Sequence, residues 1–221
     1  MSRLTCVALV FGFFLWLPAG PGHAAAAPGQ PPVEDLALMS LEQLMEVTVI
    51  STSKKEEKWF QSSSAVFVIT QEDIRRSGIL ELPEIFRIVP GMQVARLDAN
   101  KWGISARGFN GRFSNKLLVL VDGRTVYNDI FGGMVWDEYQ LPLETIERIE
   151  VIRGPGGTLW GANAMNGVIN IITKNAKDSQ GAMITAGAGT RDRGFTTLRY
   201  GGRLAEDAYY RVYGKYFNQR A

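Results

Sequence analysis

The stretch from residue 146 to residue 174 constrains the fold of this chain more than any other feature, because it must reverse direction on glycine. Residues 149–152 and 168–173 are mostly β-branched and apolar, which favours two strands. The reversal between them is rich in residues that tolerate positive φ or close backbone approach: Gly154, Gly156, Gly157, Gly161, Asn163 and Asn166. The stretch indicates a hairpin with a long glycine loop. A phosphate-cradling loop is the other interpretation, although no Gly-Lys-Ser/Thr sequence ends the loop and no clear helix follows it.

The first 26 residues read as a secretory signal peptide. Arg3 supplies a positive charge, residues 6–17 are apolar, and residues 24–26 offer an A-x-A cleavage site. A transmembrane anchor is the alternative, but a bilayer needs about 20 apolar residues and this segment is shorter. We therefore expect residues 1–26 to be removed on export.

This expected cleavage limits the chemistry open to the mature chain. The one cysteine, Cys6, and the one histidine, His23, both lie in the removed segment. Cysteine nucleophiles, histidine bases, Ser-His-Asp triads and metal sites that need cysteine or histidine are then excluded. We expect no enzyme activity, no catalytic or metal-binding residues and no cofactor. The near balance of 24 basic and 22 acidic residues also gives no sign of nucleic-acid binding.

Residues 51–174 are predicted to form a small α+β domain with a mixed sheet. Thr70, with Asp73 at capping-box spacing, should begin a helix that Gly78 ends. A second helix follows from apolar residues spaced i, i+3, i+4 and i+7: Leu82, Ile85, Phe86 and Val89. Short strands are expected at four places: 66–69, 92–96, 104–108 and 117–121.

The strand at 117–121 is apolar on both faces, which predicts a central, buried position. Asp122 and Gly123 should turn the chain back into a further strand. The loop at 128–139 carries aromatic residues that we expect to be exposed. We also expect four side chains to be buried together in one core: Leu118, Leu120, Ile85 and Phe86.

After a polar linker, predicted at residues 175–180, the chain alternates with period two. One face of residues 208–217 is apolar or aromatic: Tyr210, Val212, Gly214 and Tyr216. The opposite face is more polar: Tyr209, Arg211, Tyr213 and Lys215. This alternation is typical of outer-membrane barrel strands, and amphipathic strands of a soluble sheet are the alternative. Because residues 182–189 and 195–200 fit two more strands, residues 181–221 are predicted to hold the first strands of an antiparallel barrel.

Four segments, in this order, carry a resemblance to a known family: AVFVITQEDIR at 65–75, ISARGF at 104–109, LVLVDGR at 118–124 and the glycine-rich stretch at 146–174. Together they resemble the plug domain of TonB-dependent outer-membrane receptors, over about residues 51–174. The resemblance implies a plug domain followed by the start of a receptor barrel. Such a barrel has about 22 strands and needs several hundred residues, so we expect the barrel to be truncated in this sequence.

The resemblance also implies a function. In this family the plug fills the barrel, a scarce nutrient binds to the outer loops, and binding releases a segment called the TonB box to the energy-coupling protein TonB. We therefore expect the N-terminal part of an outer-membrane receptor for a siderophore-like, cobalamin-like or similar nutrient. Its partners would be TonB, the extracellular ligand and outer-membrane lipid. A free-standing periplasmic binding module with a plug-like fold is the alternative, and the barrel-type alternation speaks against it.

Residues 27–50 are predicted to be a flexible segment that carries the candidate TonB box. The box is a short β-prone run that extends into the next domain: Glu46, Val47, Thr48, Val49, Ile50, Ser51 and Thr52. An extended segment ahead of the plug fits a partner that binds by strand addition. A first edge strand of the domain is the other interpretation.

Ligand binding is predicted on two loops, at 98–102 and 128–136, that carry aromatic residues and should lie at one end of the plug. The candidate ligand contacts are Asp98, Asn100, Trp102, Asn128, Phe131 and Trp136. A charge cluster at the boundary of plug and barrel is predicted from Arg107, Glu147, Glu150 and Arg153. Solvated surface charges are the alternative interpretation of these four residues.

Overall fold

The computed structural model describes residues 10–15, 48–49, 57–58, 65–190 and 192–219. The chain divides into two compact units. Residues 31–173 form the first, which we call the α+β unit. Residues 1–30 and 174–221 form the second, which we call the strand unit. Among the described residues, no helix is both long enough and apolar enough to cross a membrane.

The α+β unit is built on a five-stranded sheet. The order of its strands is β4 (Val66–Thr70), β9 (Ile146–Ile152), β10 (Gly167–Thr173), β7 (Leu117–Val121) and β8 (Arg124–Thr125). β10 runs parallel to β7, while the other neighbours are antiparallel. The prediction of a mixed sheet is therefore confirmed. β7 lies between two other strands and is buried, as its apolar sequence predicts.

Helix α2 (Gln71–Ser77) begins at the predicted capping box. The Asp73 N–H donates to the Thr70 Oγ1 at 3.1 Å, and the Thr70 N–H donates to the Asp73 carboxylate at 2.9 Å. These bonds satisfy backbone donors that have no partner inside the helix. Gly78 ends the helix at φ 66°, a conformation that glycine adopts at little cost.

The second predicted helix is shorter than the span of its apolar pattern, residues 82–89. It consists of one α turn, α3 (Leu82–Ile85), followed by a 3₁₀ turn, η2 (Phe86–Ile88). Pro90 disfavours helical backbone at the preceding residue, and Val89 accordingly adopts φ −80° and ψ 119°. The helix is thus confined between Pro83, in its first turn, and Val89. Its four predicted apolar residues are nevertheless all buried.

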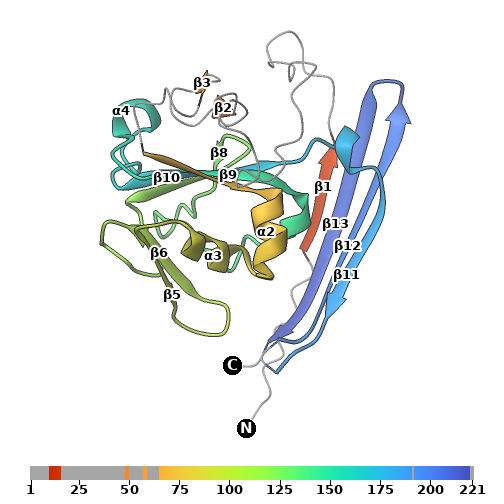
Figure 1. Cartoon of the computed structure of the whole chain (residues 1–221), viewed down its shortest axis with the longest axis horizontal. Helices are drawn as coiled ribbons and strands as arrows, with labels where there is room; N and C mark the ends of the chain where they lie inside the picture. Colours follow the sequence, from red (N-terminus) through yellow and green to blue (C-terminus); the bar gives the residue numbers. More distant parts are fainter. Residues whose placement is uncertain (1–9, 16–47, 50–56, 59–64, 191, 220–221) are drawn as a thin grey trace. The chain divides into compact units, whose positions relative to one another are not determined.

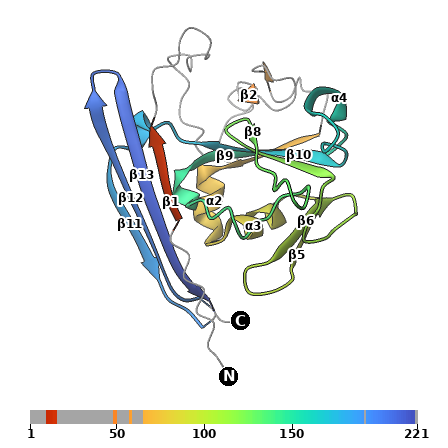
Figure 2. The same ribbon diagram turned by 180° about the vertical axis from the view of Figure 1, so that it is seen from behind.

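The sheet carries an apolar core on each of its faces. On one face α2, α3 and η2 cover the strands, and this core contains Ile85 and Phe86 (Figures 1 and 2). A smaller core on the other face contains Leu118 and Leu120. The prediction that these four residues pack together is wrong. Alternate residues of a strand point to opposite faces, so β7 presents Val119 to the helices instead.

A two-stranded hairpin follows η2 and consists of β5 (Met92–Arg96) and β6 (Trp102–Ala106). β6 begins earlier than predicted, at Trp102, and all of its residues are buried. The loop between the two strands therefore covers only residues 97–101. β9 also starts earlier than predicted, directly after the 3₁₀ turn η3 (Leu143–Thr145).

Backbone hydrogen bonds within the glycine-rich connection between β9 and β10 stabilise its conformation. The Gly156 N–H donates to the Ala164 carbonyl at 2.8 Å, and the Trp160 N–H donates to the Gly156 carbonyl at 2.8 Å. One helical turn, α4 (Gly157–Trp160), lies inside this connection. The antiparallel pairing of β9 with β10 confirms the hairpin interpretation. Because these two N–H groups bond within the loop, they give no support to the phosphate-cradle interpretation.

The strand unit contains an antiparallel sheet in the order β1, β13, β12, β11. Its long strands are β11 (Gly181–Gly187), β12 (Asp192–Ala205) and β13 (Ala208–Gln219), and the 3₁₀ turn η4 (Lys177–Ser179) precedes them. Ile184 and Leu198 pair on one face, where they are 72 % and 51 % exposed. Arg211, on the opposite face, is buried, and its Nη1 donates to the Ser179 Oγ at 3.1 Å. The predicted alternation is therefore confirmed.

The remaining strand of this sheet, β1 (Val10–Leu15), lies inside the predicted signal peptide. It pairs with β13 from Val10, opposite Lys215, to Leu15, opposite Tyr210. β1 pairs with the backbone N–H and C=O groups along this edge of β13. Without β1, these groups would be free to pair with a strand of another chain. The removal of residues 1–26 stays a prediction, and it would open this edge of β13.

Candidate functional site

Three loops of the α+β unit form the candidate site, which we call the loop assembly: 97–101 after β5, 107–116 after β6 and 126–139 after β8. Two glycines bring these loops close to their neighbours. A Cβ on Gly103 would lie 2.9 Å from the Asn110 Oδ1, and a Cβ on Gly133 would lie 2.9 Å from the Phe113 carbonyl oxygen. Any larger residue at either position would push the second loop away from its neighbour.

An aromatic pair joins the second loop to the third. The rings of Phe113 and Phe131 stack with centroids 4.3 Å apart and an interplanar angle of 10°. The Arg112 guanidinium lies 5.0 Å from the centroid of the Phe113 ring and 3.4 Å from the Asp137 carboxylate. Ring stacking and cation–π contacts are each attractive, so this group of four side chains fixes residues 107–116 against residues 126–139.

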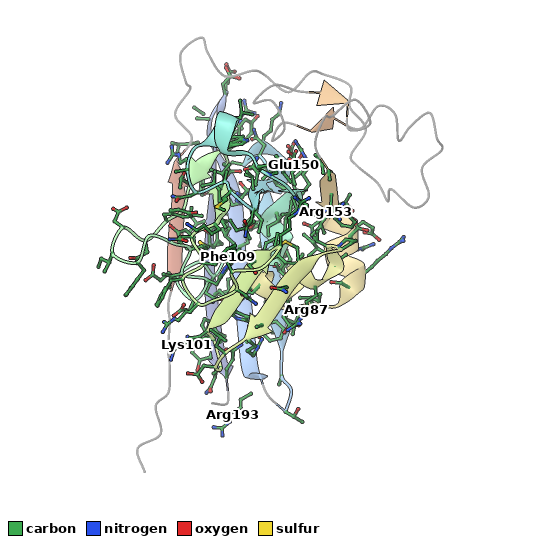
Figure 3. All side chains as sticks on the ribbon, turned by 90° about the vertical axis from the view of Figure 1, so that its left-hand side faces the viewer. Arg87, Lys101, Phe109, Glu150, Arg153 and Arg193 are labelled. Carbon is green, nitrogen blue, oxygen red and sulfur yellow. The ribbon has the colours of Figure 1, made fainter. Side chains whose placement is uncertain are left out.

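The first loop is closed by its own ion pair. The Lys101 Nζ lies 2.8 Å from the Asp98 Oδ2, and the Ala99 N–H donates to the Asp98 Oδ1 at 2.8 Å. The hydrogen bond from Lys101, followed by the one from Ala99, holds the pKa of Asp98 below its usual value, and the charge of Arg112 adds to this effect. Figure 3 labels Lys101 on the first loop and Phe109 on the second.

The second and third loops of the loop assembly expose apolar side chains. Phe109 is 69 %, Ile130 85 % and Phe131 49 % exposed. Four of the predicted ligand contacts reach the surface wholly or in part: Asp98, Asn100, Asn128 and Phe131. The Asn128 Oδ1, however, accepts hydrogen bonds from the N–H groups of Ile130 and Phe131 at 3.0 and 3.4 Å. The Asn128 side chain therefore shapes its own loop.

The exposure expected of Trp102 and Trp136 is wrong, because both are core residues, 2 % and 3 % exposed. The Arg96 guanidinium lies 4.0 Å from the centroid of the Trp102 ring, and Trp136 packs against Phe86 at 5.2 Å between ring centroids. Both tryptophans were assigned to loops between predicted strands, which suggested exposure. Large aromatic rings contribute the most hydrophobic free energy when they are buried. Neither ring is available to a ligand in this conformation.

The second loop begins with a left-handed turn that sequence reasoning missed. Arg107, Gly108 and Phe109 have φ values of 57°, 95° and 57°. For the two residues other than glycine, this conformation costs roughly 1–2 kcal/mol each. The Arg107 Nη2 donates to the Arg153 carbonyl at 3.0 Å, and the Asn166 Nδ2 donates to the Gly108 carbonyl at 3.4 Å. The glycine-rich connection therefore holds this turn in place through the residues at its two ends.

The predicted single cluster of Arg107, Glu147, Glu150 and Arg153 is wrong, because the four residues form two separate groups. Arg148, which the prediction omitted, lies 2.9 Å from the fully buried Glu150 and also pairs with Glu147. Arg107 and Arg153 bond to each other at the far end of β9, about 20 Å from Glu147 at about 3.3 Å per strand residue. Figure 3 labels Glu150 and Arg153.

A sequence signal for the missed arginine was present. Arg148 and Glu150 are two positions apart on β9, and residues at this spacing share one face of a strand. The solvated-charge alternative does not hold for Glu150, because this carboxylate is fully buried. The position of either group at a boundary with the strand unit stays a prediction.

The candidate TonB box is described only in part. Thr48 and Val49 form β2 (Thr48–Val49), which pairs antiparallel with β3 (Glu57–Lys58). The other predicted residues of the box lie outside the described residues: Glu46, Val47, Ile50, Ser51 and Thr52. Across the described part of the chain, no group of three or more acidic, histidine or cysteine side chains could hold a metal ion.

A mixed-sheet α+β unit followed by long, alternating antiparallel strands defines a plug domain with barrel strands. Residues 60–168 match the family described as the TonB-dependent Receptor Plug Domain. The chain belongs to the TonB-dependent receptors. Its fold class is the one that the sequence predicts.

Curated relatives in this family are nutrient transporters and receptors. The vitamin B12 transporter BtuB of Vibrio vulnificus (strain CMCP6) is 33 % identical over 71 % of this chain and 26 % of its own length. The ferric enterobactin receptor PirA of Pseudomonas aeruginosa is 34 % identical over 71 % of this chain and 24 % of its own length. The chain thus spans about a quarter of the length of the curated relatives that it matches.

Solved structures share the fold. The ferripyoverdine receptor of the outer membrane of Pseudomonas aeruginosa superposes with a TM-score of 0.64 and 21 % identity, over 79 % of this chain and 23 % of its own. The ferric yersiniabactin uptake receptor FyuA of Yersinia pestis gives a TM-score of 0.53 and 23 % identity, over 68 % of this chain and 23 % of its own. At these identities the likeness extends to the fold alone.

Proposed function

We propose that this chain serves in an outer-membrane receptor that binds a scarce nutrient and passes it to the periplasm, with the plug domain as the gate. The loop assembly carries this proposal, because its second and third loops pack against each other and expose Phe109, Ile130 and Phe131. Exposed apolar groups beside a few polar ones suit the binding of an organic ligand. The related B12 and ferric enterobactin proteins support a cobalamin or a siderophore as the ligand class.

The same proposal includes no covalent chemistry and places the protein in the outer membrane. The curated relatives are transporters and receptors, which supports a role without catalysis. Contact with lipid is supported by the row of exposed apolar side chains on β11 and β12, among them Ile184 and Leu198. A free-standing periplasmic module gains no support, since such a protein has no use for a lipid-facing row.

Energy for transport would come from TonB, which would pair with the candidate box. β2 supports this role because it is already extended and its ladder with β3 is only two residues long. A ladder this short is weak, so an incoming strand could replace it by strand addition.

Replacement of Val49 by proline is expected to abolish uptake and to leave ligand binding unchanged. Proline removes the backbone N–H that an added strand needs, whereas the loop assembly does not involve Val49. Binding and energised uptake of radiolabelled cyanocobalamin and ferric enterobactin would be measured on the native gene product in its own cells.

The matched control for this experiment is Val49→Ala, which keeps the backbone donor and should retain uptake. Normal uptake by Val49→Pro would place the contact with TonB elsewhere. Absence of binding of both ligands to the unmodified protein would contradict the proposed cobalamin or siderophore class.

The lipid-facing role of the strand unit leads to a different expected result. The polypeptide 51–174 contains the core of the α+β unit, and we expect it to remain monomeric without detergent. The polypeptide 51–221 adds a lipid-type face and lacks β1 on the edge of β13, so we expect it to aggregate unless detergent is present. Size-exclusion chromatography compares the two, and equally monomeric behaviour would contradict the barrel assignment.

A further inference from the structure

Residues 174–180, which connect β10 to β11, are held in a compact turn by their own hydrogen bonds. The Ser179 N–H donates to the Ala176 carbonyl at 3.2 Å, and the Ser179 Oγ donates to the Asn175 carbonyl at 2.9 Å. The Gln180 Nε2 donates to the same Ala176 carbonyl at 2.6 Å. A polar segment that only joins two units would stay solvated and would need none of these bonds. We call residues 174–180 the docked linker.

A glycine on β12 allows the docked linker to lie directly on the sheet. A Cβ on Gly201 would overlap the carbonyl oxygen of Ser179 and would lie 3.1 Å from the Gln180 Cα. Both of these are backbone atoms, so a larger residue at position 201 would push the linker away from β12. Ser179 is accordingly buried, with 1 % of its surface exposed.

Arg211 holds the docked linker from the neighbouring strand. It lies directly opposite Gly201 in the pairing of β12 with β13. Its Nη1 donates to the Lys174 carbonyl at 2.6 Å and to the Ser179 Oγ at 3.1 Å, so one guanidinium joins the two ends of the linker. Hydrogen bonds from a charged donor are roughly twice as strong as those between neutral groups. Each of these contacts joins two residues of the strand unit, and none depends on the exposure of a surface.

We propose that Gly201 and Arg211 form a clamp that keeps the docked linker on the barrel strands while the plug rearranges during transport. Lys174 directly follows β10, which is the last strand of the α+β unit. A pull on the candidate TonB box, at the other end of the plug, can rearrange the plug only if its far end does not follow the pull. The role in transport rests on the proposed function, whereas the docking of the linker is independent of it.

Hydrogen exchange on the purified native gene product tests the docking. In Arg211→Ala, the amides of residues 175–180 should exchange about tenfold faster or more, because the two hydrogen bonds from the guanidinium are lost. Gly201→Ala should accelerate the same amides through a clash with the linker backbone, and it leaves Arg211 in place. The amides of β12 and β13 should keep their native exchange rates in both variants.

Transport assays test the role of the clamp. Ligand binding and energised uptake are measured in cells that produce the native protein or a variant, with whichever of cyanocobalamin and ferric enterobactin the native protein binds. Both Arg211→Ala and Gly201→Ala should bind this ligand with native affinity and should take it up several-fold more slowly. A change that only destabilised the receptor would lower binding and uptake together.

Two matched variants serve as controls. Arg203→Ala removes another arginine of β12, whose side chain bonds to the carbonyls of Ala205 and Glu206 instead of the linker. Gly214→Ala adds a methyl group to β13 at a position where a Cβ would meet no atom within 4 Å. Both controls should match the native protein in linker exchange and in uptake.

The outcomes separate the clamp from the function on which its role rests. Native exchange of the linker in Arg211→Ala and Gly201→Ala would overturn the clamp, and so would faster exchange throughout β12 and β13. Faster exchange confined to the linker, together with undiminished uptake, would overturn its role in transport. Failure of the native protein to take up either ligand would overturn the proposed function, while the exchange measurement would still decide whether the linker is clamped.

Discussion

Replacement of Phe86 by alanine is expected to lower the free energy of unfolding of the α+β unit by about 3–5 kcal/mol. The side chain is completely buried, and its ring packs against Trp136 at 5.2 Å between centroids. Alanine would leave a cavity between η2 and the sheet that these residues cannot fill without moving. Because small domains are stable by only about 5–15 kcal/mol, this loss would remove a large share of the stability of the unit.

Urea unfolding of the polypeptide 51–174, followed by tryptophan fluorescence, measures this loss. Ile88→Ala is the matched control, since Ile88 lies in the same 3₁₀ turn and is 36 % exposed. We expect the control to change stability far less. A change below about 1 kcal/mol for Phe86→Ala would mean that the ring contributes little to the core.

Replacement of Gly167 by alanine is expected to destabilise the same unit by about 3 kcal/mol or more. A Cβ at this position would overlap the carbonyl oxygen of Ile152 and lie 3.2 Å from the Leu117 Cδ1. β10 is held between β9 and β7, so neither neighbour can move aside without loss of ladder hydrogen bonds. A clash with a backbone atom inside a sheet can be relieved only if a strand moves, and such a movement destabilises the fold.

Gly154→Ala provides the comparison for this result. Gly154 lies in the same glycine-rich connection, and a Cβ there would meet no atom within 4 Å. The two variants should therefore differ widely in their urea midpoints although the chemical change is identical. Similar midpoints would show that β9 and β10 separate easily at Gly167.

Local sequence signals were sufficient where a few neighbouring residues decide the backbone. The capping box of Thr70 and Asp73 forms as its spacing predicts. Asp122 and Gly123 adopt φ values of 48° and 76° and reverse the chain from β7 into β8, as the Asp-Gly pair predicts. Period-two alternation in β13 likewise predicts its two faces correctly, because a strand turns every second side chain to the same side.

Signals for the candidate site were less complete, because its parts come from separate segments. Their assignment to loops suggested that Trp102 and Trp136 would be exposed, yet both are buried in the core that the helices cover. The strained turn at Phe109 has no local cause in its sequence. It depends on Arg153 and Asn166, which lie more than 40 residues away along the chain.

The sequence by itself determined the family, the mixed sheet and the alternating strands. Repeated spacing and ordered motifs can be recognised in the sequence without information on contacts between distant residues. Only the tertiary structure decided how the core divides between the two faces of the sheet and that Glu150 is buried beside Arg148. It also decided which aromatic rings stay in solvent. Burial is a property of what packs over a residue, and that neighbour is supplied by segments far away in the chain.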